Sequence, residues 1–239
     1  SDVGDRSERE HASVQHRVGA AYCTRAVLTP STASKITSDI CKMVPVMPVL
    51  VVEDVAVARP LAEALIAGGL SVLEVTLRTP AALDVIKEMA NVPGATVGAG
   101  TLLSPKDVTA ARQAGAKFGV TPGTTDRLLE ACEAEDLPLL PGAATASEVL
   151  SLLERGYTVQ KFFPAEANGG PSALKAIGAP LPEARFCPTG GVTPQNAMSY
   201  LSLKNTLCVG GSWVAPKALI EAGKWDDIET LARAACQLV

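Results

Sequence analysis

Lys161 is the side chain of this sequence best placed to act as a nucleophile. It lies in the run Val159 to Pro164, an apolar and aromatic segment with the composition of a buried strand. Burying an ammonium is costly unless it is paired. Desolvation also lowers the pKa of an amine, so that free base becomes available to attack a ketone and form a Schiff base. The alternative is a lysine whose stem lines the sheet while its ammonium reaches solvent at the strand end.

Glu74 supplies a second reactive group. Glu74, Thr76 and Arg78 alternate with apolar residues, so the three polar side chains share one face of a predicted strand. The alternative is that Glu74 forms a salt bridge with Lys161 and has no further role. An inward glutamate, arginine, threonine and lysine at one rim are harder to explain as packing, and they indicate a reaction centre.

Two glycine pairs indicate where an anion would bind. Segments 187–191 and 209–212 read Cys-Pro-Thr-Gly-Gly and Val-Gly-Gly-Ser. Glycines let backbone N–H groups approach an anion, and the loops after strands seven and eight of a barrel are the usual phosphate seat. Either pair alone is more often a plain turn. Both together favour phosphate, with the Ser212 hydroxyl as a further donor.

The composition argues against other classes of function. The two histidines stand at positions 11 and 16, before every predicted element, and the six cysteines form no Cys-x-x-Cys pair. We therefore predict no histidine triad, no metal and no cofactor, and reduced thiols favour a cytoplasmic location. A net charge of −4 with scattered basic residues argues against nucleic-acid binding. The longest apolar run, 43–52, has strand length and contains two prolines, so no membrane span is predicted.

The elements that must position these groups follow a regular order from residue 34 onward. Eight short β-branched runs alternate with segments rich in Ala, Leu and Glu: Val46–Val52, Ser71–Leu77, Thr96–Thr101, Phe118–Gly123, Pro138–Gly142, Val159–Pro164, Arg185–Gly191 and Leu207–Trp213. Apolar strands that alternate eight times with helices predict a closed parallel (β/α)8 TIM barrel. The alternative is an open doubly wound sheet, but no Gly-x-Gly-x-x-Gly follows the first run.

Proline and glycine mark the predicted helix ends. The pairs Thr79-Pro80, Ser104-Pro105 and Thr193-Pro194 each predict an N-cap followed by proline at the first helical position. Glycines at 68, 69, 115 and 156 predict helix ends. An extra N-terminal helix over Ser34–Cys41 is expected to cover the barrel floor.

Residues 1–33 are predicted to be a disordered leader or a sequence added for expression. They mix acidic and basic residues with Ser, Thr, Ala and Gly, without a sustained period. Their acidic residues argue against a transit peptide, and Arg25 interrupts the only short apolar stretch, which argues against a signal peptide. Residues 34–239 would then form a single barrel domain.

Taken together, the motifs resemble those of the 2-keto-3-deoxy-6-phosphogluconate (KDPG) aldolase family. The resemblance runs from about Val44 to the C-terminus and rests on six segments: EVTLRT at 74–79, VGAGT at 97–101, VTPG at 120–123, KFFPAE at 161–166, RFCPTGG at 185–191 and GGSW at 210–213. It implies a class I aldolase of the Entner-Doudoroff pathway that needs no metal. It also implies a homotrimer of (β/α)8 barrels and a phosphorylated 2-keto sugar acid as substrate.

The resemblance also implies a role for individual residues. Lys161 would be the Schiff-base lysine and Glu74 the general acid/base. Arg78 and Thr101 would bind the substrate carboxylate. The pocket walls would be Pro122 and Phe163. The hydroxyl and phosphate end would be held by Thr189, Gly190, Gly191, Gly210, Gly211 and Ser212.

Other functions compete with this interpretation. Related aldolases act on the galactonate epimer or on 4-hydroxy-2-oxoglutarate. Galactonate-type members replace the threonine of Pro-Thr-Gly-Gly by an apolar residue, so Thr189 favours the gluconate substrate. A phosphate-binding barrel isomerase or epimerase relies on inward Asp, His or metal, which the lack of histidine in the core disfavours. A barrel that only binds a phosphorylated ligand would leave Lys161 without a role.

Overall fold

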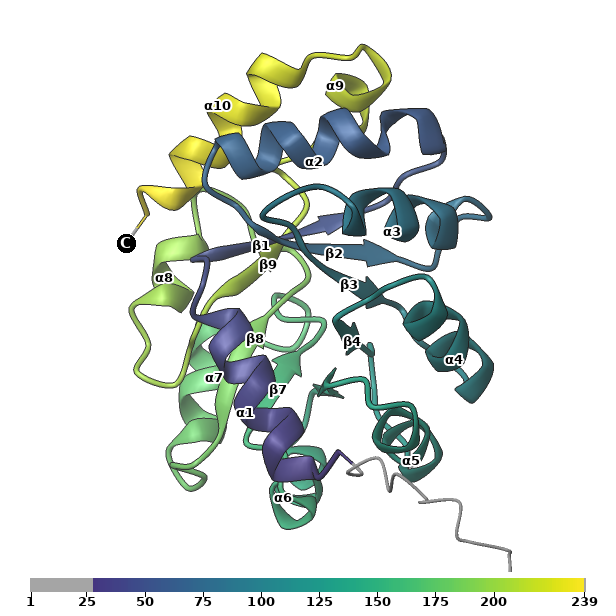
Figure 1. Cartoon of the computed structure of the whole chain (residues 1–239). Helices are drawn as coiled ribbons and strands as arrows, with labels where there is room; N and C mark the ends of the chain where they lie inside the picture. The colour runs from purple at the N-terminus through teal and green to yellow at the C-terminus, as the bar shows by residue number, and fades with distance from the viewer. Residues whose placement is uncertain (1–27, 239) are drawn as a thin grey trace, which may run out of the picture.

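The structure is a computed structural model that describes residues 28–238 (Figure 1). The strands are β1 (Val46–Leu50), β2 (Val72–Thr76), β3 (Thr96–Gly100), β4 (Phe118–Val120), β5 (Leu139–Leu140), β6 (Gly142–Ala143), β7 (Val159–Phe162), β8 (Arg185–Pro188) and β9 (Val209–Gly211). One sheet has the order β5-β4-β3-β2-β1-β9 and the other β6-β7-β8. All of these pairings are parallel.

The two sheets together make one closed barrel. Pro141, which lacks an N–H, separates β5 from β6, and these two pieces are the halves of the fifth barrel strand. Single bridges from Phe186 to Thr206 and from Thr189 to Gly210 join the segments that contain β8 and β9. The eightfold (β/α)8 prediction is therefore confirmed. The doubly wound alternative is wrong, because neighbouring strands follow one another in sequence around the ring.

Helices connect the strands and surround them (Figure 1). They are η1 (Val55–Val57), α2 (Ala58–Ala67), α3 (Ala82–Ala90), α4 (Pro105–Gln113), α5 (Asp126–Ala134), α6 (Ala146–Arg155), α7 (Gly170–Gly178), α8 (Ala197–Leu201), α9 (Lys217–Glu221) and α10 (Trp225–Cys236). Within residues 28–238, none of the helices is long and apolar enough to cross a bilayer.

The predicted helix starts are right at one of three positions. Ser104 caps α4, since its hydroxyl accepts a hydrogen bond from the Asp107 N–H at 3.2 Å. Thr79 does not cap α3, because its hydroxyl instead donates to the Val52 carbonyl at 2.6 Å. Thr193 does not cap α8 either. Its own N–H donates to Asn196 Oδ1 at 2.7 Å, and the helix begins only after that turn.

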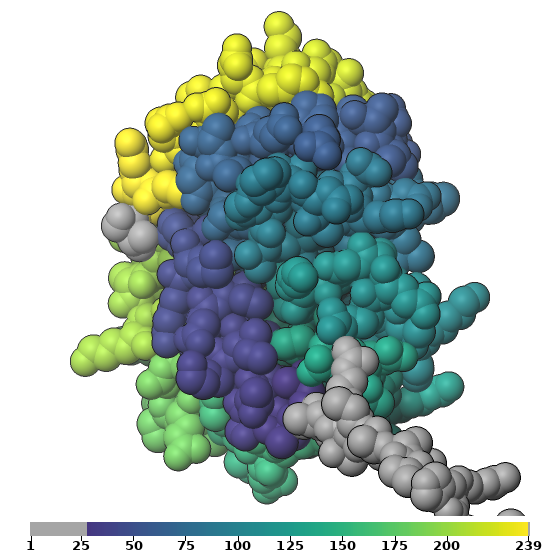
Figure 2. All heavy atoms as spheres, viewed as in Figure 1, coloured from purple at the N-terminus to yellow at the C-terminus, as the bar shows by residue number. Residues whose placement is uncertain are grey.

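The first helix, α1 (Pro30–Cys41), covers the barrel floor as predicted. The Ser34 hydroxyl accepts hydrogen bonds from the N–H groups of Thr158 and Val159, at the start of β7. Figure 2 shows α1 as a band across this face, between α2 above it and α6 and α7 below it.

The predicted start of α1 needs correction. The helix begins at Pro30 rather than Ser34, because the Thr29 hydroxyl accepts from the Thr32 N–H and proline takes the first helical position. The last residues of the predicted leader, 30–33, therefore belong to α1. Residues 1–27 of that leader lie outside the described residues.

Strand alternation sorts the side chains between the barrel interior and the helical layer. Phe162 and Phe186 are neighbours on β7 and β8, with ring centroids 6.4 Å apart in an edge-on arrangement. Lys161 and Cys187, one position away on the same strands, are register partners and must point to the opposite face. The aromatic pair therefore packs under the helices, and the lysine and the thiol face the barrel interior.

Candidate active site

Lys161 and Glu74 meet in the barrel interior. Lys161 Nζ lies 3.3 Å from Glu74 Oε1, and the two side chains are only 7% and 2% exposed. β7 and β2 present them from different sides of the ring. The alternative interpretation, in which the lysine ammonium reaches solvent at the strand end, is therefore wrong. The lysine charge is paired inside the barrel.

The environment of Glu74 favours a carboxyl that can hold a proton. Burial raises the pKa of Glu74 above its usual range, although the Lys161 ammonium acts in the opposite direction. A buried carboxyl with a raised pKa can accept and return protons near neutral pH. The pair thus combines a primary amine with a proton acceptor in hydrogen-bonding distance.

The last residue of β3 packs against Glu74. A Cβ on Gly100 would stand 2.2 Å from Glu74 Oε1, so only glycine leaves room for the carboxylate. Thr101 follows with a left-handed φ of 61°, which a non-glycine residue rarely adopts. Such backbone conformations concentrate at functional sites.

Phe163 borders the Lys161 ammonium, and Pro122 stands shortly after β4. The Lys161 ammonium lies 5.2 Å from the centroid of the Phe163 ring, in range for a cation–π contact. Pro122 is half-buried directly after β4. Thr189 is buried after β8, on the strand that pairs with the lysine strand.

Arg78 and Ser212 lie further out. Both are exposed, and neither side chain has a hydrogen-bond or ion-pair partner among residues 28–238. The structure therefore does not bring them into contact with Lys161 or Glu74. They stand at strand ends on the same side of the barrel, where a bound molecule could reach them.

The loop after β8 exposes backbone donors. Gly190 and Gly191 both have left-handed φ, 101° and 77°. Three successive carbonyls of this loop are occupied: that of Thr189 by the Ala165 N–H, that of Gly190 by the Glu166 N–H and that of Gly191 by the Asn196 side chain. By contrast, the N–H groups of Gly191 and Val192 have no acceptor within the described part of the chain. A loop with engaged carbonyls and open N–H groups suits an anion.

The second glycine pair is explained partly by packing. A Cβ on Gly210 would stand 2.2 Å from Thr189 Oγ1, and one on Gly211 would stand 1.9 Å from the Trp213 ring. These glycines therefore make room for neighbouring side chains. The N–H groups of Ser212 and Trp213 have no acceptor among residues 28–238, so this loop also offers donors.

Sequence reasoning missed Cys187. Its Sγ lies 3.9 Å from Thr189 Oγ1, and Cys187 is the register partner of Lys161. Hydrogen bonds from the Cys208 and Cys41 thiols, together with the Lys161 charge, lower the pKa of Cys187. The signal for its position was present in the sequence, because Cys187 stands two residues before Thr189 and so shares its face.

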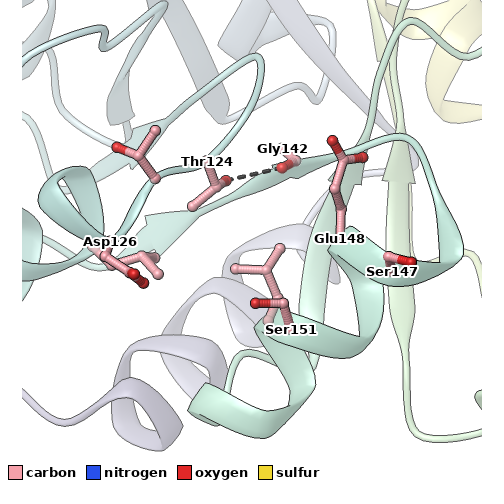
Figure 3. A pocket seen from close by; sticks show the side chains of 9 residues that line it. Thr124, Asp126, Gly142, Ser147, Glu148 and Ser151 are labelled. Atoms are coloured by element: carbon pink, nitrogen blue, oxygen red, sulfur yellow. Dashed lines mark hydrogen bonds between the residues drawn. The ribbon is translucent and has the colours of Figure 1, made fainter.

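A separate hollow of about 240 Å³ lies between the starts of α5 and α6. Figure 3 shows its polar lining, where the Thr124 hydroxyl donates to the Gly142 carbonyl and Asp126 and Glu148 carry charge. None of the site residues predicted from the sequence lines it. The Glu148 carboxylate accepts hydrogen bonds from the Thr145 N–H and hydroxyl, in the cap of α6. We therefore assign it no part in the site.

Among residues 28–238, no group of three His, Cys, Asp or Glu side chains is arranged to hold a metal ion.

Comparisons with known proteins find relatives that are similar in sequence and fold. The family model "Aldolase: KDPG and KHG aldolase" matches residues 37–231. A curated relative, the 2-dehydro-3-deoxy-phosphogluconate aldolase of Pseudoalteromonas atlantica, is 53% identical over 203 residues, which cover 84% of this chain and 94% of the relative.

Two solved structures are similar in both fold and sequence. One is the 2-keto-3-deoxy-6-phosphogluconate aldolase of Zymomonas mobilis ZM4 with 3-phosphoglycerate, with a TM-score of 0.82 and 50% identity, covering 86% of this chain and 97% of that one. The other is the KDPG aldolase from Legionella pneumophila with pyruvate captured as a covalent carbinolamine, with a TM-score of 0.81 and 42% identity, covering 87% and 98%.

Proposed function

The chain belongs to the KDPG and KHG aldolase family, and on this premise we propose that it splits 2-dehydro-3-deoxy-6-phosphogluconate into pyruvate and glyceraldehyde 3-phosphate. This aldol cleavage, a lyase reaction, belongs to the Entner-Doudoroff pathway. The observation that carries the assignment of residues is the buried pair of Lys161 and Glu74, 3.3 Å apart. An amine beside a proton acceptor is what Schiff-base chemistry requires.

Lys161 forms the covalent intermediate. Glu74 takes the proton of the ammonium, and the free amine attacks the C2 ketone of the substrate. Glu74 then returns that proton to the hydroxyl of the carbinolamine, which leaves as water, so that an iminium forms and Glu74 is again a carboxylate. The iminium can accept the electron pair of the C3–C4 bond. The resemblance to a relative that was captured as a covalent carbinolamine with pyruvate supports this step.

Glu74 then handles the second proton. It accepts the proton of the C4 hydroxyl, directly or through a water, and the C4 carbonyl of glyceraldehyde 3-phosphate forms as the C3–C4 bond breaks. The electron pair leaves an enamine on Lys161. Protonation of the enamine at C3 and hydrolysis release pyruvate and restore the amine.

The remaining predicted residues orient the substrate. Arg78 and Thr101 bind the carboxylate and so fix the ketone against the amine. Pro122 and Phe163 wall the pocket around the imine. The far hydroxyl and the phosphate meet Thr189, the N–H groups of the two glycine loops (Gly190, Gly191, Gly210, Gly211) and Ser212. The open N–H groups of Gly191 and Val192 support this placement.

A second substrate follows from the same chemistry. Cleavage of 4-hydroxy-2-oxoglutarate needs the lysine, the glutamate and the carboxylate site, but no phosphate seat. The matching family includes KHG aldolases, which supports this second activity. The presence of Thr189 favours the gluconate epimer over the galactonate epimer among phosphorylated substrates.

Trapping with pyruvate and borohydride tests the Schiff base. Mass spectrometry should find one adduct on the peptide that contains Lys161, together with loss of activity. The exposed Lys175 provides a matched control, since Lys175→Met should be trapped like the parent. An unmodified Lys161 in an enzyme that stays active would overturn the assignment. An isomerase or a simple binding barrel would also give no adduct. Turnover should survive EDTA.

The proposal extends to a cytoplasmic homotrimer. The family resemblance supports it, as do apolar side chains on the surface, among them Leu103 at 64% and Met43 at 51% exposure. Light scattering should give three times the mass of the chain, and a monomer at micromolar concentration would contradict this assembly.

A further inference from the structure

Glu166 lies against the glycine loop that follows β8. Its N–H donates to the Gly190 carbonyl at 3.1 Å. A Cβ on Gly191 would stand 2.7 Å from both Cβ and Cγ of Glu166, so the glutamate stem packs directly on that glycine. A rotation of the Glu166 side chain could therefore bring its carboxylate to the open N–H groups of this loop.

A partner from another element holds this carboxylate. The hydroxyl of Tyr200, in α8, donates a hydrogen bond to Glu166 Oε1. Burial and the neighbouring Glu166 carboxylate raise the pKa of the Tyr200 hydroxyl, which therefore stays protonated and able to donate at neutral pH. A Cβ on Gly170 would stand 3.4 Å from Glu166 Oε1 and 3.5 Å from Tyr200 Oη, so the pair occupies the space above the start of α7.

The direction in which Glu166 points matters for an anionic substrate. A carboxylate that turned toward the glycine N–H groups would accept their hydrogen bonds itself. It would also repel a phosphate dianion at the same place. A neutral or cationic residue at this position would not create that conflict.

We propose that Tyr200 is a positioning residue that holds the Glu166 carboxylate away from the glycine donors and so keeps them open for the substrate phosphate. This role rests on the phosphate seat of the proposed function. A simpler role for the Tyr200–Glu166 bond, as a tie between the loop after β7 and α8, predicts equal effects on every substrate. The two roles therefore differ in what they predict for substrates with and without phosphate.

Kinetics of Tyr200→Phe and Glu166→Asp separate these roles. Phenylalanine keeps the ring but loses the donor, while aspartate keeps the charge but is too short to keep the bond to Tyr200. For each variant, KM for the phosphorylated substrate should rise by about 2- to 10-fold, the size of one net hydrogen bond. The kcat and the cleavage of 4-hydroxy-2-oxoglutarate should stay close to the parent. If one variant fails to fold, the other carries the test.

The double variant Tyr200→Phe/Glu166→Gln is the matched control. The neutral amide cannot repel phosphate, so KM should return toward the parent value although the Tyr200 bond is still missing. Equal losses on both substrates, or no recovery in the double variant, would overturn the positioning role. Failure of the phosphate seat would look different: inorganic phosphate would not inhibit the parent enzyme, whatever stands at position 200.

Discussion

The centre around Lys161 and the rim around Gly190 use different parts of the polypeptide. At the centre, two side chains from positions 87 apart in the sequence are buried and paired. At the rim, the donors are backbone N–H groups that glycine leaves accessible, and the Ser212 hydroxyl is exposed. The centre depends on two reactive side chains, whereas the rim depends on glycines, which have no side chain to cover their backbone N–H groups. The chemistry and the preference for phosphate should therefore respond to mutation separately.

The largest effect is expected from Lys161→Met, which removes the nucleophile. It should abolish trapping by borohydride and lower kcat/KM by on the order of 10⁴-fold or more. Calorimetry with inorganic phosphate should still show binding, because the rim does not use the lysine. Loss of phosphate binding in a folded variant would show that the two regions are not independent.

Glu74→Gln should have the next largest effect. Without a proton acceptor, turnover should fall by about 10²- to 10⁴-fold, while some imine can still be trapped with pyruvate. Glu154→Gln, on an exposed face of α6, is the control and should match the parent. Turnover near the parental rate in Glu74→Gln would reduce Glu74 to a structural partner of Lys161.

Ser212→Ala tests the rim alone. Loss of one charge-assisted hydrogen bond should weaken the phosphorylated substrate by about 1 to 3 kcal/mol, roughly 5- to 150-fold in kcat/KM. Cleavage of 4-hydroxy-2-oxoglutarate should hardly change, because that substrate has no phosphate to lose contact with. Ser151→Ala, beside the hollow of Figure 3, provides a control with the same chemical change. Equal losses on both substrates would assign Ser212 to packing or to the carboxylate end.

The smallest effect concerns pH and separates the two regions by titration. The pKa of Glu74 is raised in the folded protein above its ordinary value of 4.5. The folded state then keeps a proton that the unfolded chain has lost, so the stability of the parent relative to Glu74→Gln should fall as pH rises from about 4.5 through the raised pKa. Urea unfolding at a series of pH values measures this. The difference in unfolding free energy between the parent and Ser212→Ala should not change with pH. If the stability of the parent relative to Glu74→Gln rose with pH, the Lys161 charge would outweigh burial in setting the pKa of Glu74.

The site residues that could be predicted from the sequence are recognisable from their immediate neighbours in the chain. A lysine and a glutamate inside apolar runs are visible without a structure, and the barrel prediction places their strands around one interior. The glycine pairs are equally visible in the sequence, but the sequence does not show why glycine is required at these positions. Gly100 and Gly210 are needed because Glu74 and Thr189 occupy the space of a Cβ, and those neighbours come from other strands.

The parts that the sequence does not predict depend on partners far along the chain. Thr79 has the pattern of a helix cap, yet its hydroxyl donates a hydrogen bond to the Val52 carbonyl, 27 positions away in the sequence. The bond between Tyr200 and Glu166 spans 34 positions and leaves no period or motif in the sequence. Pro141 divides the fifth strand without changing its place in the barrel. Local patterns therefore predict the elements and the reactive groups, and long-range packing determines which hydroxyls and carboxylates are already occupied.

The helix on the barrel floor has a consequence for the order in which the chain folds. Ser34 hydrogen-bonds to Thr158, 124 positions later in the sequence. Contacts of such separation form only after a long loop has closed, which slows folding. During synthesis, α1 leaves the ribosome before the other elements that the structure describes, but its docking surface is complete only when the sixth barrel strand has emerged. Among the described helices, the earliest to be made is therefore one of the last to pack, and until then its apolar side stays exposed.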